Sequence, residues 1–145
     1  MSDVRLVQTG LDAQGRSTVV SDERVASVAM PTGRRVHPLW SRDEPLGGGA
    51  SAEGISGPFP PPGGIRYWLF TVPAGERDPA SFGLHRTETV DLGFVVSGVL
   101  TLALEDGTST DLHVGDAFIQ RGTTHAWFNR GSQDAVAVLT VLGGS

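Results

Sequence analysis

The sequence of 145 residues contains no cysteine. This absence excludes disulfide bonds, thiolate zinc sites and cysteine nucleophiles, so any bound metal must take nitrogen and oxygen ligands. Basic clusters are also missing, because no run of basic residues is longer than Arg34-Arg35 and the formal net charge is -5. We therefore expect neither nucleic acid nor a membrane surface as a partner, and a small neutral or weakly charged ligand fits better.

Long apolar runs are absent as well. The first residues, Met1 to Val7, lack the apolar stretch of a signal peptide, and no run approaches the length that spans a bilayer. We expect a cytoplasmic protein. Segments with helical periodicity are scarce, whereas 20 glycines and 9 prolines predict many short strands joined by turns. The length suits a single domain over residues 1–145.

The chain divides into three parts. Residues 1–40 indicate short N-terminal strands, beginning with a hairpin, and residues 41–64 are rich in glycine and proline, which predicts a long, mobile loop. The core covers residues 65–142 and opens with Ile65–Val72, the window of highest β propensity. About ten short strands at regular spacing predict an all-β, two-sheet jelly-roll β-barrel. Within it, Leu100, Leu102 and Leu104 alternate with small residues and should face the core.

Two polar blocks flank an apolar stretch of this core, one from His85 to Asp91 and one from Gly115 to Asn129. Successive side chains of an extended chain alternate between faces, so His85, Thr87 and Asp91 share one face. By the same count His125 lies on the same face as Trp127. If both faces point into one barrel, two imidazoles and a carboxylate converge, and such a group can hold a divalent cation or catalyse proton transfer.

Other residues are assigned by the same alternation. Trp127 is either a cavity wall, which would favour flat, aromatic or cyclic ligands, or a core residue. Tyr67 and Trp68 cannot both face inward, and we assign Tyr67 to the pocket. Neither His37, in an edge-like segment interrupted by a proline, nor His113 has a partner by spacing, and both are expected at the surface.

The two blocks resemble the paired motifs of the cupin superfamily. In the first motif, His-x-His is followed by Glu and a closing Gly; here His85 and Asp91 take the first His and the Glu positions, and Thr87 replaces the second His. Gly98 closes the motif at the right distance. The second motif opens on Gly115-Asp116 and ends with Gly122, His125 and Asn129, without the usual proline.

The resemblance implies a small single-domain cupin with a ligand in its barrel. His85, Asp91 and His125 are then the metal-ligating or catalytic set, with Thr87 in the pocket. The metal implied is a divalent ion (Fe, Mn, Zn or Ni), although replacement of the middle His leaves a metal-free acid/base pocket open. Three functions stay open: a lyase, decarboxylase or isomerase; a binding or sensing module without turnover; and a non-haem iron dioxygenase.

Dimerisation is common among small cupins, and the resemblance therefore implies a homodimer. The strands between Val4 and Val20, together with exposed sheet edges, would supply the surface, since unpaired edges invite pairing with another chain.

Overall fold

The computed structural model describes residues 3–43, 57–75, 83–107 and 109–144. These ranges contain strands only, and therefore no helix that is long and apolar enough to cross a membrane. In chain order the strands are β1 (Val4–Leu11), β2 (Ser17–Val25), β3 (Val28–Ala29), β4 (Arg35–Arg42), β5 (Ile65–Val72), β6 (Thr89–Ser97), β7 (Leu100–Leu104), β8 (Ser109–Leu112), β9 (Ala117–Arg121), β10 (His125–Phe128) and β11 (Ala135–Gly143).

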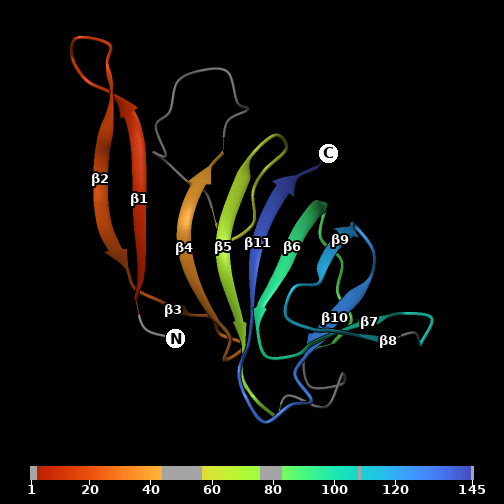
Figure 1. Cartoon of the computed structure of the whole chain (residues 1–145). Helices are drawn as coiled ribbons and strands as arrows, with labels where there is room; N and C mark the ends of the chain where they lie inside the picture. The colour runs from red at the N-terminus through yellow and green to blue at the C-terminus, as the bar shows by residue number, and fades with distance from the viewer. Residues whose placement is uncertain (1–2, 44–56, 76–82, 108, 145) are drawn as a thin grey trace.

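Two antiparallel sheets form the body of the molecule (Figure 1). The larger has the order β3-β4-β5-β11-β6-β9 and the smaller has the order β10-β7-β8. Strands that are neighbours in space are often far apart in sequence, as where β11 lies between β5 and β6. This arrangement confirms the predicted all-β jelly roll, built from two packed sheets.

The core lies between the two sheets. Strand β5 contributes Trp68, Phe70 and Val72, which alternate with residues of the outer face, and β7 contributes Leu100. Leu102 is half-buried and packs against this core, as the alternation predicts. The inner face of β5 thus supplies large aromatic rings at the place where a cavity opens.

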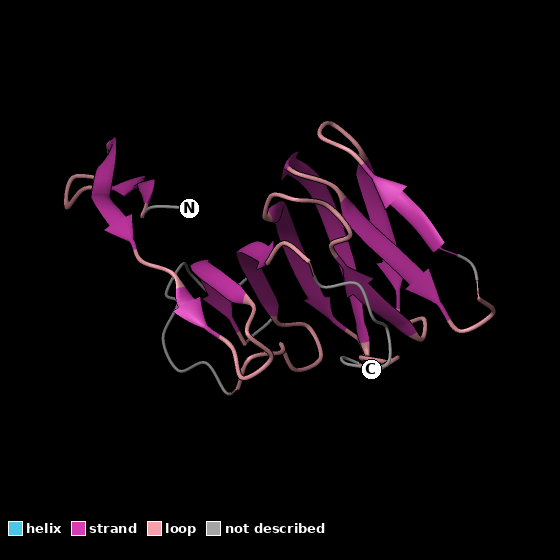
Figure 2. Ribbon diagram, turned by 90° about the horizontal axis from the view of Figure 1, so that it is seen from below, coloured by secondary structure: helices cyan, strands magenta, loops and turns pink. Residues whose placement is uncertain are grey.

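The N-terminal residues depart from the sheets. The predicted hairpin is present as β1 and β2, and Figure 2 shows it standing apart from the two packed sheets. Strand β4 continues to Arg42, so the loop predicted over residues 41–64 begins later than expected. A register shift between Pro38 and Trp40 allows the pairing with β5 to resume beyond the proline. Most of the predicted mobile loop, residues 44–56, lies outside the described residues.

His37 is a correction to the sequence-based prediction. Its side chain is only 1% exposed, although we expected it at the surface. It pairs across the sheet with Leu69 of β5, which is also buried. The outer face of β4 is therefore covered at His37. The prediction failed because it treated this segment as an exposed edge strand.

Candidate functional site

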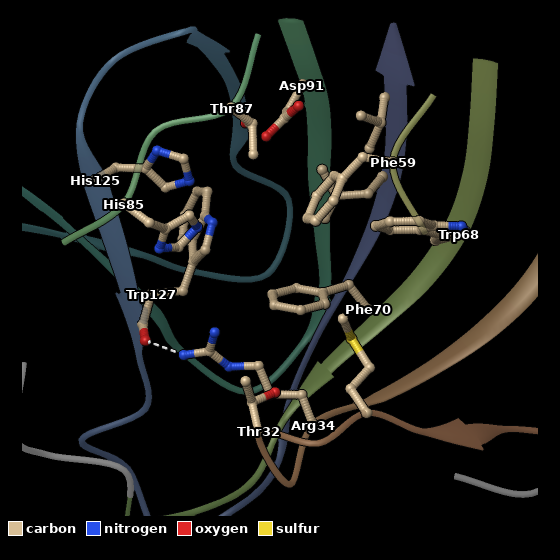
Figure 3. Close-up of a pocket in the computed structure, with 13 residues that line it drawn as sticks. Thr32, Arg34, Phe59, Trp68, Phe70, His85, Thr87, Asp91, His125 and Trp127 are labelled. Carbon is tan, nitrogen blue, oxygen red and sulfur yellow. Dashed lines mark hydrogen bonds between the residues drawn. The ribbon is translucent and has the colours of Figure 1, made fainter. Parts of the chain in front are cut away.

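A cavity of about 300 Å³ opens between the sheets (Figure 3). Its wall is largely aromatic and apolar, with rings from both the large and the small sheet. The polar side chains are fewer and come from three separate parts of the chain. The wall residues include Phe59, Trp68, Phe70, Trp127, Leu139 and Val141, and the polar ones are Thr32, Arg34, His85, Thr87, Asp91 and His125.

His85 and His125 are brought together by the backbone. The segment before β6 forms an isolated antiparallel bridge with the start of β10, in which His85 N donates to His125 O at 3.0 Å and His125 N donates to His85 O at 2.9 Å. Residues directly opposite in such a pair project to the same side. The two imidazole ring centroids therefore lie 4.6 Å apart on the cavity wall.

A hydrogen bond fixes the tautomer of His125. Its Nδ1 lies 2.8 Å from the carbonyl oxygen of Thr123, and because a carbonyl can only accept, Nδ1 must carry the proton. In the neutral ring, Nε2 then has a free lone pair. Burial is the main cause that lowers the pKa of His125, and the neighbouring His85 and Arg34 lower it further, so the neutral form is favoured.

A chain of hydroxyl groups leads to the carboxylate. Thr89 Oγ1 donates to Asp91 Oδ1 at 2.8 Å, and Thr87 Oγ1 lies 2.8 Å from Thr89 Oγ1. Since the single hydroxyl proton of Thr89 goes to Asp91, Thr87 must be the donor to Thr89. The hydroxyl oxygen of Thr87, which lines the cavity, is thereby left as an acceptor toward a ligand.

Gln120 links the carboxylate to the turn before His125. Its Oε1 accepts hydrogen bonds from Thr123 N at 2.8 Å and Thr123 Oγ1 at 2.6 Å, while its Nε2 donates to Asp91 Oδ2 at 3.4 Å. The side chain is 2% exposed. One buried amide therefore connects Asp91 with Thr123, the residue whose carbonyl oxygen orients His125.

Arg34 enters the cavity from the start of β4. Its guanidinium donates from Nη2 to the carbonyl oxygen of Trp127 at 2.7 Å and lies over the Phe70 ring, 5.8 Å from its centroid. The residue is 6% exposed. Arg34 thus brings a positively charged side chain to the cavity wall, a feature that the sequence analysis did not identify.

Most of the predicted site residues line this one cavity. His85, Thr87, Asp91, His125 and Trp127 all do so. Tyr67 is not among the lining residues and is a correction.

Two other side chains of β5, instead of that of Tyr67, line the cavity. Trp68 and Phe70 face the cavity, because β5 places its even-numbered side chains inward.

The described residues do not fit a three-ligand metal centre. No group of three His, Asp or Glu side chains within them is placed to hold a metal ion. His85 and His125 are adjacent, but Asp91 is held by Thr89 and Gln120, and a threonine stands at the remaining position of the motif. The metal implied by the resemblance therefore stays a prediction, and the two imidazoles lie next to each other on the cavity wall.

Comparison with known proteins agrees with this architecture. The family model described as "Cupin domain" matches residues 68–142. Phomopsin biosynthesis cluster protein D from Diaporthe leptostromiformis is 40% identical over 74 residues, which cover 51% of this chain and 36% of that protein. The cupin-domain-containing oxidoreductase srdD from Neurospora crassa is 44% identical over 46 residues, 32% of this chain and 24% of that protein. The matches thus span only a minor part of these relatives.

Solved structures share the fold. The cupin domain of Cnp3 from Schizosaccharomyces pombe aligns with a TM-score of 0.60 and 11% identity, over 99% of this chain and 88% of that chain. The polyketide cyclase RemF from Streptomyces resistomycificus aligns with a TM-score of 0.55 and 18% identity, over 81% and 72% of the two chains. At these identities the likeness establishes the fold alone.

Proposed function

This chain belongs to the cupin family, and we propose that it is an enzyme that moves a proton on a small organic molecule, with His125 as the base. The reaction class is isomerisation or elimination next to a carbonyl group. The observation that carries this proposal is the hydrogen bond from His125 Nδ1 to Thr123 O, because it leaves the lone pair of Nε2 available in a residue that lines the cavity.

The proton-transfer step follows from the neutral state of the His125 ring. Neutral His125 takes a proton from the carbon next to the carbonyl, and the imidazolium returns it to another carbon or to the leaving oxygen. Burial first, and then the neighbouring His85, lower the pKa of His125, which favours the neutral ring that accepts the proton. The cavity wall around the imidazoles is largely aromatic and apolar.

The shape of the cavity supports a small, flat ligand. Trp68, Phe70 and Trp127 present ring surfaces to a space of about 300 Å³, a size suited to a single small molecule. An organic metabolite is the proposed ligand, in keeping with two relatives that are named as phomopsin biosynthesis cluster proteins.

An oxidoreductase is the second candidate, because two relatives carry that name. Redox chemistry on this fold needs a bound metal or another redox group. The described residues gather two imidazoles but no third His, Asp or Glu ligand beside them. Proton transfer uses what these residues supply and is therefore the function that the geometry supports best.

Deuterium exchange tests the proposal without knowledge of the natural substrate. The probe is phenylacetone, a neutral ketone with an aromatic ring, incubated in deuterated buffer near neutral pH and followed by NMR at its methylene group. We expect the protein to accelerate exchange, and His125→Gln to reduce the acceleration by roughly 100-fold or more. His113→Gln is the control, because His113 is exposed and does not line the cavity. Binding of the probe without accelerated exchange would instead indicate a binding module.

A further inference from the structure

We propose that the substrate carries an aliphatic tail, which lies in a second, apolar cavity beside the first cavity, the one lined by His85 and His125. This inference rests on the proposed function, since it extends the substrate class for the same site to a carbonyl compound with a tail. The second cavity has a volume of about 310 Å³, close to that of the first. Its wall is drawn from residues 28–68, which precede both polar blocks of the sequence.

The wall of the second cavity is mostly apolar. Its side chains come from β3, β4, β5 and the segments beside them. The apolar ones include Val28, Met30, Pro31, Val36, Pro38 and Trp68. Among the described residues that line it, Arg66 alone is charged. The chemistry of this cavity therefore depends on whether Arg66 requires a charged ligand.

The charge of Arg66 is already compensated. Its Nη2 lies 2.7 Å from Asp43 Oδ1, and its side chain is 1% exposed. Nη1 also donates to the carbonyl oxygen of Ile65 at 3.0 Å, and Nη2 to that of Gly57 at 3.3 Å. A ligand group beside Arg66 thus meets an ion pair whose charges already cancel. An apolar group fits this cavity better than a charged one, which would lose its hydration without gaining a counter-ion.

Two side chains stand between the cavities, because Met30 and Trp68 line both of them. Trp68 is the fixed part of this partition. It is 7% exposed and meets Phe59 edge to face, with ring centroids 6.0 Å apart. Figure 3 shows Phe59 and Trp68 on the opposite side of the first cavity from His125. A ligand that extends across the first cavity from His125 therefore reaches the border of the second at Trp68.

Met30 is the adaptable part of the partition. Its backbone is held in the turn between β3 and β4, where Met30 N donates to Arg34 O at 2.7 Å and Gly33 N donates to Met30 O at 3.0 Å. Its side chain is partly buried and packs against the core. An unbranched thioether with three rotatable bonds adapts readily to a neighbouring group. We expect the tail of the ligand to displace this side chain and to pass between it and Trp68.

An aliphatic chain suits such a passage. It is narrow and flexible, and each methylene group that moves from water into an apolar cavity contributes favourably to binding. Each cavity alone lies at the lower end of the range of ordinary ligand sites, roughly 300–1,000 Å³, and the two joined lie well within it. The flat head of the substrate then occupies the aromatic first cavity, and the tail occupies the second.

Two neutral ketones with the same head test the inference. Phenylacetone ends in a methyl group, and 1-phenyloctan-2-one carries a hexyl group in its place. Their affinities are measured by calorimetry on the full chain. We expect the wild-type protein to bind 1-phenyloctan-2-one at least about 10-fold more tightly than phenylacetone, because the hexyl group is buried in the second cavity.

A substitution in the second cavity locates the tail. Val28 lines the second cavity and not the first, and it pairs across β3 and β4 with Val36, which faces the core. Val28→Phe should fill part of the second cavity, remove most of the gain in affinity and leave phenylacetone binding unchanged. Val19→Phe on β2 is the control, because Val19 is 56% exposed, as Val28 is 55% exposed, and lines neither cavity. It should change neither affinity.

Four outcomes would overturn the inference: no binding of either ketone, equal affinities in the wild type, a gain that survives Val28→Phe, or an equal loss of both affinities in that variant. The comparison within the wild type needs no variant, so it holds even if Val28→Phe does not fold.

The test is separate from that of the proposed function, which is read from deuterium exchange. Accelerated exchange of phenylacetone without a gain for the longer ketone would refute the tail site and leave the enzyme proposal standing. Tighter binding of the longer ketone, lost in Val28→Phe, without exchange of either ketone would refute the enzyme proposal and support the tail site.

Discussion

His85 and His125 face each other across a two-hydrogen-bond bridge, with backbone N to O distances of 3.0 and 2.9 Å and imidazole centroids 4.6 Å apart. Forty residues of sequence separate them, yet the bridge sets their relative position through the main chain. A change in either side chain should therefore alter the chemistry of the cavity without removing the contact that builds it.

The first prediction concerns pH and stability. Burial lowers the pKa of His125 below its usual 6.5, so the unfolded chain takes up a proton at a higher pH than the folded chain does. The free energy of unfolding should fall as the pH drops below about 6.5 and level off for this residue once the folded pKa is passed. Urea unfolding at a series of pH values measures this. His125→Gln should lose this part of the slope, and parallel profiles for the two proteins would contradict the assignment.

The second prediction concerns the hydroxyl chain. Thr89→Val leaves Asp91 Oδ1 without its donor inside the protein, which should cost about 1–3 kcal/mol of unfolding free energy. It should also slow the deuterium exchange of phenylacetone. The charge of Asp91 raises the pKa of His125, and the substitution removes the donor that holds this carboxylate in place. Thr101→Val is the matched control: it removes a 2.7 Å hydrogen bond to Asp111, outside the cavity. It should destabilise the protein and leave exchange intact. Equal effects of the two variants on the exchange rate would refute a role of the Thr87–Thr89–Asp91 hydrogen bonds in the reaction.

The third prediction concerns Gly98, which closes the first motif. It has a φ of 69°, and an added Cβ would meet the carbonyl oxygen of Asp134 and lie 2.9 Å from Ala135 Cα. Gly107 also has a positive φ, 87°, but an added Cβ there meets nothing within 4 Å. Gly107→Ala should therefore cost about 1–2 kcal/mol of unfolding free energy, because only the left-handed backbone conformation is unfavourable there.

Gly98→Ala should cost about 4 kcal/mol or more, because the backbone of the facing segment must shift as well. Denaturant unfolding of both variants gives the difference. Similar losses would show that the close approach to Asp134 and Ala135 is not what requires glycine at position 98.

Alternation along the strands predicted much of the site. A period of two places His85, Thr87 and Asp91 on one side without any knowledge of their neighbours, and the structure puts all three on the cavity wall. The same rule puts Trp127 beside His125. Asp91 lies in β6, whereas His85 and Thr87 precede that strand, and His85 is placed by its bridge to His125.

Alternation did not predict side-chain orientation in a strand whose two faces are both buried. Along β5, Leu69 and Thr71 on the outer face are as well covered as the core residues, so hydrophobicity did not show that Trp68, and not Tyr67, faces the cavity. The sequence analysis did not identify Arg34 as a cavity residue, for a different reason. Its contact with Trp127 joins residues 93 positions apart, and only the sheet topology brings them together.

The fourth prediction concerns metal binding. By the resemblance, Thr87 stands at the position of the middle histidine of the first cupin motif, and the described residues do not form a three-ligand group. Thr87→His should therefore raise the affinity for Ni²⁺ at least about 10-fold over the wild type, since a third imidazole would join His85 and His125. Titration with Ni²⁺ followed by calorimetry measures the gain. Thr110→His, at an exposed position on β8, controls for added histidine, and an equal gain there would contradict the prediction.

The most direct test of the central claim is the protonation state of His125 itself, measured by two-dimensional ¹H–¹⁵N NMR of the imidazole nitrogens at neutral pH. The hydrogen bond to Thr123 O and the lowered pKa predict a neutral ring with the proton on Nδ1 and an unprotonated Nε2. His125→Gln identifies the resonances by their loss. A neutral ring with the proton on Nε2, or an imidazolium at that pH, would leave no base in the cavity at this position and would contradict the account.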